Sequence, residues 1–262
     1  MSAKCSKLAL YRGWPEKGVY SWSPFVTKVE FRFRHAGLAY DVDAGSVKVA
    51  PKGKIPYVDL GPLQVDGEKG PSFLGDSTFI IQRLLSMGHL PDLNESLPKQ
   101  LRLEDLALRA LLEDKLYFYH MRERWLENFY VQRDKALWSM PFPVRVLVGY
   151  LIYRGITNTL HGQGVGRLSG EEVRSLKTEI WRTIDNVLEC RLRHASGDHD
   201  LVWLLGGEQP TEADATLFGF ITSVLVSDSA PESKKLVKTF SSVITYAERI
   251  HNHLFPDYEK WR

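Results

Sequence analysis

The stretch GKIPYVDLGP, residues 53–62, places a proline where an apolar strand begins. Ile55, Tyr57 and Val58 favour a strand. Pro56, however, has no N–H for a sheet ladder, and prolines are confined to edge strands, strand starts and bulges. Pro56 therefore either marks a sheet edge or forms a rigid turn that points the backbone of Ile55 outward. A cis bond there would present that backbone to an extended peptide, and only about 5–6% of X-Pro bonds are cis.

Short apolar runs separated by turn signals surround this stretch in residues 1–92. Phe25, Val29 and Phe33 share one helical face, and Gly37 ends that helix. The other segments alternate between strand and helix patterns. In order we expect KLALY (7–11, strand), SPFVTKVEFRFRHAG (23–37, helix), LAYDVDA (38–44, strand), the Pro56 strand, GPLQVDG (61–67, strand) and DSTFIIQRLLSMG (76–88, helix). This order predicts an α/β unit of about the size of a small domain.

From residue 98 onward the strand pattern disappears and helical spacing takes over. The boundary is predicted in LPDLNESLP, residues 90–98, because proline and asparagine interrupt regular structure. The predicted helices lie at about 101–127, 142–160, 169–195, 211–226 and 232–254. The second part of the chain is therefore expected to be all-helical.

Composition narrows the functional classes. The 262 residues are 44% hydrophobic and 25% charged, with a formal net charge of +2, which is typical of a globular protein without a basic nucleic-acid surface. Cys5 and Cys190 match no metal-ligand or disulfide pattern and favour a reducing compartment. The N-terminus shows no targeting pattern. The apolar run at 142–156 is broken by Arg145 and Arg154, so it is expected to be a buried core helix without a transmembrane segment. We expect a cytoplasmic location.

Two predicted helices begin at residues that commonly cap helices. Ser23 precedes Pro24, and Asp76 and Ser77 precede an apolar run, so capping alone explains both starts. The same positions would also suit ligands, because free N–H groups and the helix dipole stabilise anions at a helix N-terminus. Ser23 would then face an anion such as a thiolate. Asp76 and Ser77 would hold the amino group and the carboxylate of an amino acid.

Other motifs favour structural roles. Thr211 and Asp214 form a capping-box variant, and Ser169 is expected to cap a helix after a glycine-containing loop that is a weak nucleotide-binding signal. No histidine pair has metal-ligand spacing, and we expect no metal. The individual histidines are interpreted as surface or loop residues: His120, His161 and His194.

The order of these motifs resembles the glutathione transferase superfamily over nearly the whole chain. Five blocks are similar to its failed-axon-connections and metaxin-like branch: SPFVTKVEFRFRHAGLAYD, GKIPYV, GDSTFII, LYFYHMRERW and GVGRLSGEEV. The resemblance implies the glutathione transferase fold, with a thioredoxin-like α/β domain over residues 1–92 and an all-α domain over residues 98–262. It also makes a homodimer the default expectation.

The resemblance further implies that glutathione is the co-substrate. Pro56 would be the cis-proline, and the backbone of Ile55 would pair with the cysteinyl part of glutathione. Asp76 and Ser77 would bind the γ-glutamyl end, and Lys54 would add positive charge near the glycyl carboxylate.

The catalytic residue implied by the resemblance is Ser23, whose hydroxyl would hydrogen-bond the glutathione sulfur and favour the thiolate. Redox-active relatives carry Cys-Pro-x-Cys where this chain has SPFV at 23–26, so thiol exchange at this site is not expected. Tyr11 is a competing hydroxyl, and Tyr20 and Ser21 are further candidates.

The electrophile would be held against the helical domain, at the helix at 101–127. The loop RGWPEKGVYSW at 12–22 would border this pocket, unless its tryptophans belong to the core. Arg124 would either anchor an anion or form a structural ion pair. The expected acceptor-pocket residues are Trp22, Phe25, Tyr117 and Arg124.

The sequence therefore predicts a serine-type glutathione transferase whose thiolate attacks a hydrophobic electrophile, in detoxification or secondary metabolism. A biosynthetic enzyme acting on one metabolite differs only in its acceptor. The alternative is a non-catalytic, metaxin-like binding or interaction module, which is favoured if the loop at 13–22 fills the cleft.

Overall fold

The computed structural model describes residues 7–63, 72–195, 197 and 200–261. Four strands of these residues form one sheet in the order β2-β1-β3-β4. β1 pairs in parallel with β2 and antiparallel with β3, and β3 pairs antiparallel with β4. Their bounds are Leu8–Tyr11 (β1), Tyr40–Asp43 (β2), Tyr57–Asp59 (β3) and Phe73–Gly75 (β4).

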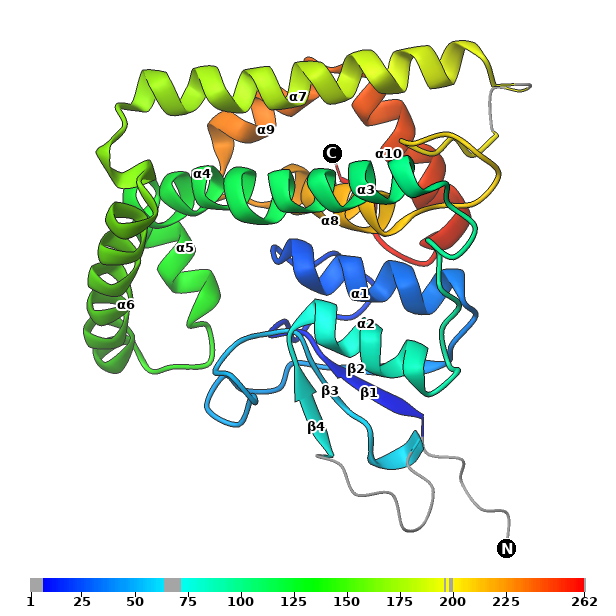
Figure 1. Ribbon diagram of the computed structural model, residues 1–262. Helices are drawn as coiled ribbons and strands as arrows, with labels where there is room; N and C mark the ends of the chain where they lie inside the picture. Colours follow the sequence, from blue (N-terminus) through cyan, green and yellow to red (C-terminus); the bar gives the residue numbers. More distant parts are fainter. Residues whose placement is uncertain (1–6, 64–71, 196, 198–199, 262) are drawn as a thin grey trace, which may run out of the picture.

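Helices α1 (Pro24–His35) and α2 (Ser77–Ser86) cover one face of this sheet (Figure 1). α1 connects the parallel strands β1 and β2, which cannot be joined by a tight turn. Its residues Val29 and Phe33, one helical turn apart, pack in the core under the sheet together with Leu8 and Leu10 of β1. The predicted α/β order of strand, helix and strand is confirmed for this part of the chain.

The remaining helices form a layer on the far side of α1 from the sheet (Figure 1). One long helical run begins at α3 and includes two π-helical segments, η2 and η3. The bounds are Lys99–Ala110 (α3), Leu111–Leu116 (η2), Tyr117–Arg122 (α4), Glu123–Glu127 (η3), Phe129–Ala136 (α5), Phe142–Gln163 (α6), Gly170–Arg193 (α7), Glu212–Val226 (α8), Pro231–Lys238 (α9) and Ser241–Leu254 (α10). The fold is thus thioredoxin-like followed by all-helical, as predicted.

α1 lies between the two parts and contacts α8 closely. Phe31 of α1 packs against Trp203 and Phe218 of the helical core. Gly219 of α8 permits this approach, because a Cβ atom there would clash with the carbonyl oxygen of Pro24. The interface between α1 and α8 is therefore a packed core rather than a hinge.

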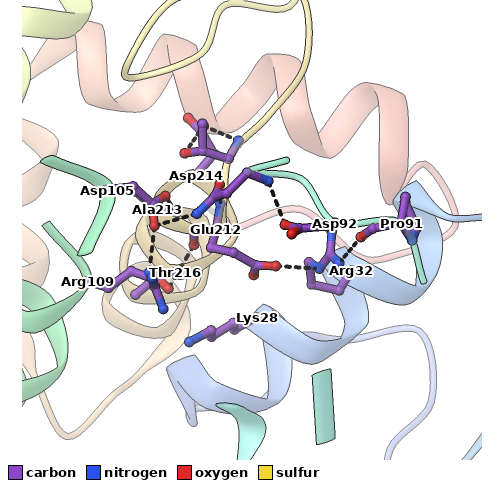
Figure 2. Close-up of polar contacts among 12 residues, drawn as sticks. Lys28, Arg32, Pro91, Asp92, Asp105, Arg109, Glu212, Ala213, Asp214 and Thr216 are labelled. Atoms are coloured by element: carbon purple, nitrogen blue, oxygen red, sulfur yellow. Dashed lines mark hydrogen bonds and ion pairs between the residues drawn. The ribbon is translucent and has the colours of Figure 1, made fainter. Parts of the chain in front are cut away.

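Buried polar contacts add specificity to this interface (Figure 2). Arg32 of α1 is buried and forms an ion pair with Glu212 at the start of α8, at 3.2 Å between Nε and Oε1. Asp105 of α3 accepts the N–H of Ala213 and pairs with Arg109. Because a buried charge is costly without a partner, these contacts favour one docking arrangement of α1, α3 and α8.

Two expectations about local structure are wrong. The predicted strand at 61–67 lies partly outside the described residues, and Gly61–Leu63 form a 3₁₀ turn instead. The carboxylate of Asp59 accepts the N–H of Gly61, which ends β3 in a side-chain-stabilised turn. The apolar helix expected to be buried, α6, is instead largely exposed. Cys5 also lies outside the described residues.

No helix in the described ranges combines the length and the apolar character that crossing a membrane requires.

Candidate functional site

The two ends of the segment at 12–22, which joins β1 to α1, are packed into the protein, while its middle at 15–17 is exposed. The side chains of Trp14, Tyr20 and Trp22 are buried. Trp14 and Trp22 contact each other at 5.4 Å between ring centroids. Tyr20 packs against Phe218 of α8, and its hydroxyl lies 2.7 Å from Nδ1 of His251. These contacts place the segment between α1 and the helical layer.

A buried charged group fixes the beginning of this segment. The side chain of Arg12 is fully buried and lies 3.5 Å from the carboxylate of Glu30 on α1. Arg12 also donates to the hydroxyl of Tyr258, which in turn donates to Glu30 at 2.5 Å. Burial raises the pKa of Glu30, and the charge of Arg12 offsets part of that effect. The segment is thereby attached to α1 and to the C-terminal residues.

Arg124 fixes the other end of the segment. Its guanidinium group donates to the carbonyl of Trp22 at 2.7 Å, and to the carbonyl and hydroxyl of Ser223 on α8 at 2.9 and 2.8 Å. The Ser223 hydroxyl donates to the same Trp22 carbonyl at 2.6 Å. Burial lowers the pKa of Arg124 to about 10. Arg124 therefore holds two backbone segments together.

A small cavity adjoins the first turn of α1. Its volume is about 40 Å³, and its lining includes Pro24, Tyr117, Arg124 and Ser223. The ring of Phe25 contacts the ring of Tyr117, with 5.2 Å between the ring centroids. Pockets that bind small molecules usually measure about 300–1,000 Å³. A larger cavity of about 390 Å³ lies elsewhere, between the ends of α4, α7 and α9, and does not include α1.

Ser23 occupies the N-cap position of α1. Its side chain makes no capping hydrogen bond, and its N–H donates to the hydroxyl of Ser21 at 3.2 Å. The competing hydroxyl, Tyr11, stacks on Tyr57 at 4.4 Å between ring centroids. Because side chains alternate along β1 and its Leu10 faces the helices, Tyr11 lies on the opposite face of the sheet from α1. Burial raises the pKa of Tyr11, which opposes formation of a phenolate.

The predicted glutathione-binding residues form a second group around the start of α2. The Ile55–Pro56 bond is cis. The N–H of Asp76 donates to the Pro56 carbonyl at 3.3 Å, which joins the two segments. Asp76 has a φ of 84°, uncommon for a residue with a side chain, and its carboxylate caps α2 through Thr78.

The other two residues of this group differ in exposure. Ser77 is buried at the first position of α2, while Lys54 is exposed in the loop before the cis bond. Ile55 contacts Gly13, where a Cβ atom would clash with the Ile55 side chain. The segment at 12–22 therefore also touches the residue that is predicted to face the glutathione backbone.

The structure thus brings the predicted residues together in two sets. One set, here called the cradle, contains Ile55, Pro56, Asp76 and Ser77; the other contains Trp22, Phe25, Tyr117 and Arg124. Their catalytic and binding roles stay predictions.

Several residues of this region are not identified by sequence reasoning. Ser223 follows Thr222 in the largely apolar second half of α8. A buried hydroxyl needs a hydrogen-bond partner, and that requirement is the available sequence signal. No sequence pattern identifies Arg12 as a buried residue of this region. His120, expected at the surface, is buried against Trp181, because its helix is enclosed there by α7 and α8.

Comparison with known proteins places this geometry in context. A family model described as the glutathione S-transferase N-terminal domain matches residues 24–129. Metaxin-2 of Mus musculus is 26% identical over 231 residues, which cover 84% of this chain and 76% of that protein.

Solved structures share the fold. The glutathione transferase GSTFuA3 from Phanerochaete chrysosporium has a TM-score of 0.56 at 18% identity and covers 98% of this chain and 99% of its own. A glutathione transferase family member from Pseudomonas fluorescens pf-5, solved with two glutathione molecules bound, has a TM-score of 0.55 at 15% identity and covers 97% of this chain and 94% of its own.

These findings correct one expectation. The predicted cytoplasmic location is wrong, because the metaxin-2 relatives are proteins of the mitochondrial outer membrane. The family model and the solved structures agree on the fold. The chain has the glutathione transferase fold, matches the glutathione S-transferase N-terminal domain over residues 24–129, and is similar to metaxin-2.

Proposed function

We propose that this chain is a non-catalytic, metaxin-like interaction module that works at the mitochondrial outer membrane. The observation that supports the absence of catalysis is that the end of the segment at 12–22 packs against the start of α1, where Arg124 and Ser223 hold the Trp22 carbonyl. The similarity to metaxin-2 supports the interaction role and the location.

The physical argument concerns thiolate stabilisation. Lowering the pKa of a thiol from about 8.5 to about 6.5 requires roughly 3 kcal/mol of preferential stabilisation of the thiolate. Ser23 and the first turn of α1 would have to supply it in direct contact with the sulfur. The cavity that adjoins the first turn of α1 measures about 40 Å³, well below the usual volume of pockets that bind small molecules. Arg124, the cation next to that cavity, already donates to three protein acceptors.

A second candidate function is glutathione binding without turnover. It is favoured by the cradle, in which the Asp76 N–H and the Pro56 carbonyl join two segments and Asp76 keeps a costly positive φ. Backbone strain of this kind persists only where the surroundings impose it and is often found at ligand sites. Glutathione would be held by its γ-glutamyl end, with its sulfur excluded from α1.

The deciding experiment measures conjugation of glutathione to a chlorodinitrobenzene electrophile by the purified full chain across neutral and alkaline pH. We expect no rate above that of buffer, and the same trace for Ser23→Ala. Turnover that Ser23→Ala abolishes would overturn the non-catalytic proposal.

Calorimetric titration of glutathione tests the second candidate. Binding that Ser77→Ala removes would support it, and Ser86→Ala is the matched control because Ser86 lies at the other end of α2. Absence of binding to the folded wild type would exclude glutathione as the ligand. Fractionation of cells expressing the full chain tests the location, and a protein absent from the mitochondrial fraction would contradict it.

A further inference from the structure

Helix α6 presents a continuous apolar face to solvent. Leu147, Tyr150 and Leu151 are 63%, 56% and 58% exposed, and their spacing places them on one side of the helix. Phe142 at the helix start and Trp138 in the preceding turn are 65% and 43% exposed. Single exposed apolar side chains are ordinary, but a contiguous group marks an interaction surface.

The opposite side of α6 attaches it to the protein. Gly149 lies against the side chain of Arg133 on α5, and Tyr153 contacts Phe129 at 5.3 Å between ring centroids. Leu160 near the end of the helix is fully buried. α6 lies at the edge of the helical layer (Figure 1), so its outer side has no partner among the described residues. Folding of α6 therefore does not depend on the exposed leucines.

The charged residues of α6 itself are all basic. From residue 135 to residue 170 the chain contains no Asp or Glu. Arg154 lies one turn beyond Tyr150 on the same side of α6, and Arg167 follows the helix. Both are exposed, and neither forms an ion pair within the part of the chain that the structure describes. Arg145 is different, because it lies 3.7 Å from Asp134.

These features together are typical of a helix that lies in a membrane interface. Such helices bury apolar and aromatic side chains at the boundary of the acyl chains, while basic residues contact anionic headgroups. A second copy of this chain is a poorer occupant, because a two-fold contact pairs the same patch of both copies and would place two positively charged faces against each other.

We propose that the outer face of α6 binds the surface of an anionic lipid bilayer. Leu147 and Leu151 enter the acyl boundary, Trp138 and Tyr150 lie at headgroup level, and Arg154 contacts lipid phosphates. This inference rests on the proposed membrane location and names the surface that makes the contact.

The test is flotation of the purified full chain with vesicles of phosphatidylcholine alone or mixed with phosphatidylserine. We expect flotation with the mixed vesicles that decreases as salt is raised. Leu147→Asp/Leu151→Asp should lower the fraction bound at least tenfold. Arg154→Gln should lower the apparent affinity about fivefold, since one basic residue near an anionic surface contributes about 1 kcal/mol.

The matched control is Leu103→Asp/Leu106→Asp on α3, where both leucines are similarly exposed. This variant should float like the wild type. The lipid assignment is overturned if the wild type does not float with anionic vesicles, or if the α6 double variant floats equally well. A wild-type dimer that the α6 variant converts to monomer, without flotation, would assign the face to a second copy instead.

The two proposals fail separately. Mitochondrial fractionation without vesicle binding would remove the lipid surface and leave the location intact. Vesicle binding together with Ser23-dependent turnover would remove only the non-catalytic function.

Discussion

Replacement of Arg124 by methionine should release the segment at 12–22 and destabilise the protein. Arg124 donates three hydrogen bonds, to the Trp22 carbonyl and to two oxygens of Ser223. Hydrogen bonds from charged donors contribute about 1.5–3 kcal/mol each, so three amount to about 4–9 kcal/mol. Because methionine carries no charge, the Arg124→Met variant avoids the cost of burying one.

The size of this burial cost, which the variant avoids, follows from the pKa of Arg124. Burial lowers it from 12.5 to about 10, which corresponds to about 3 kcal/mol. Ser223 also continues to donate to the Trp22 carbonyl in the variant. We therefore expect Arg124→Met to lower the free energy of unfolding by about 1–6 kcal/mol, measured by urea denaturation.

Limited trypsin digestion gives a readout that is specific to the segment. Lys17 is exposed within it and should be cleaved slowly in the wild type and quickly in Arg124→Met. Arg122→Met is the matched control, because Arg122 lies on the same helical run and donates to the carbonyls of Val165 and Leu168 instead. A loss of stability below about 1 kcal/mol, or equal cleavage after Lys17 in both variants, would refute the role of Arg124 in holding the segment.

Three further predictions concern stability. Burial opposes ionisation of Glu123, but the charge of Lys177 outweighs burial and lowers the pKa of Glu123. The carboxylate's contribution to stability is therefore complete above about pH 4.5 and is lost as the pH falls through the lowered pKa. Glu123→Gln should cost about 3–5 kcal/mol at neutral pH, and its difference from wild type in urea denaturation should shrink below pH 4.5. Asp214→Ala should cost at least about 3 kcal/mol in the same assay, because four donors lose their buried acceptor. Gly13→Ala should lower the melting temperature, because Gly13 has a positive φ and an added methyl group would displace Ile55; an unchanged melting temperature would contradict that contact.

Much of the fold follows from patterns within short windows. The spacing of Phe25, Val29 and Phe33 predicts α1, and Ser169 predicts the start of α7, where the capping box with Glu172 is present. Such signals are local, because a helical face or a cap involves residues within a few positions of one another. The strand expected at 61–67 fails for a local reason too: the side chain of Asp59 competes for the N–H of Gly61.

The environment of the candidate site depends on contacts between residues far apart in the chain. An apolar pattern on α6 does not specify whether a protein core or solvent faces it, since hydrophobicity gives the periodicity and not the partner. Burial of His120 likewise results from enclosure by α7 and α8 rather than from its neighbours in sequence.

By itself, the sequence determined the order of elements, the capping residues and the resemblance to the glutathione transferase superfamily. Only the tertiary structure decided that the end of the segment at 12–22 is held at the start of α1, because that result needs Arg124 and Ser223, about a hundred and two hundred positions away, to meet the Trp22 carbonyl. Hydrogen bonds of this kind form only after the helices have packed, since the sequence separation carries no information about their geometry.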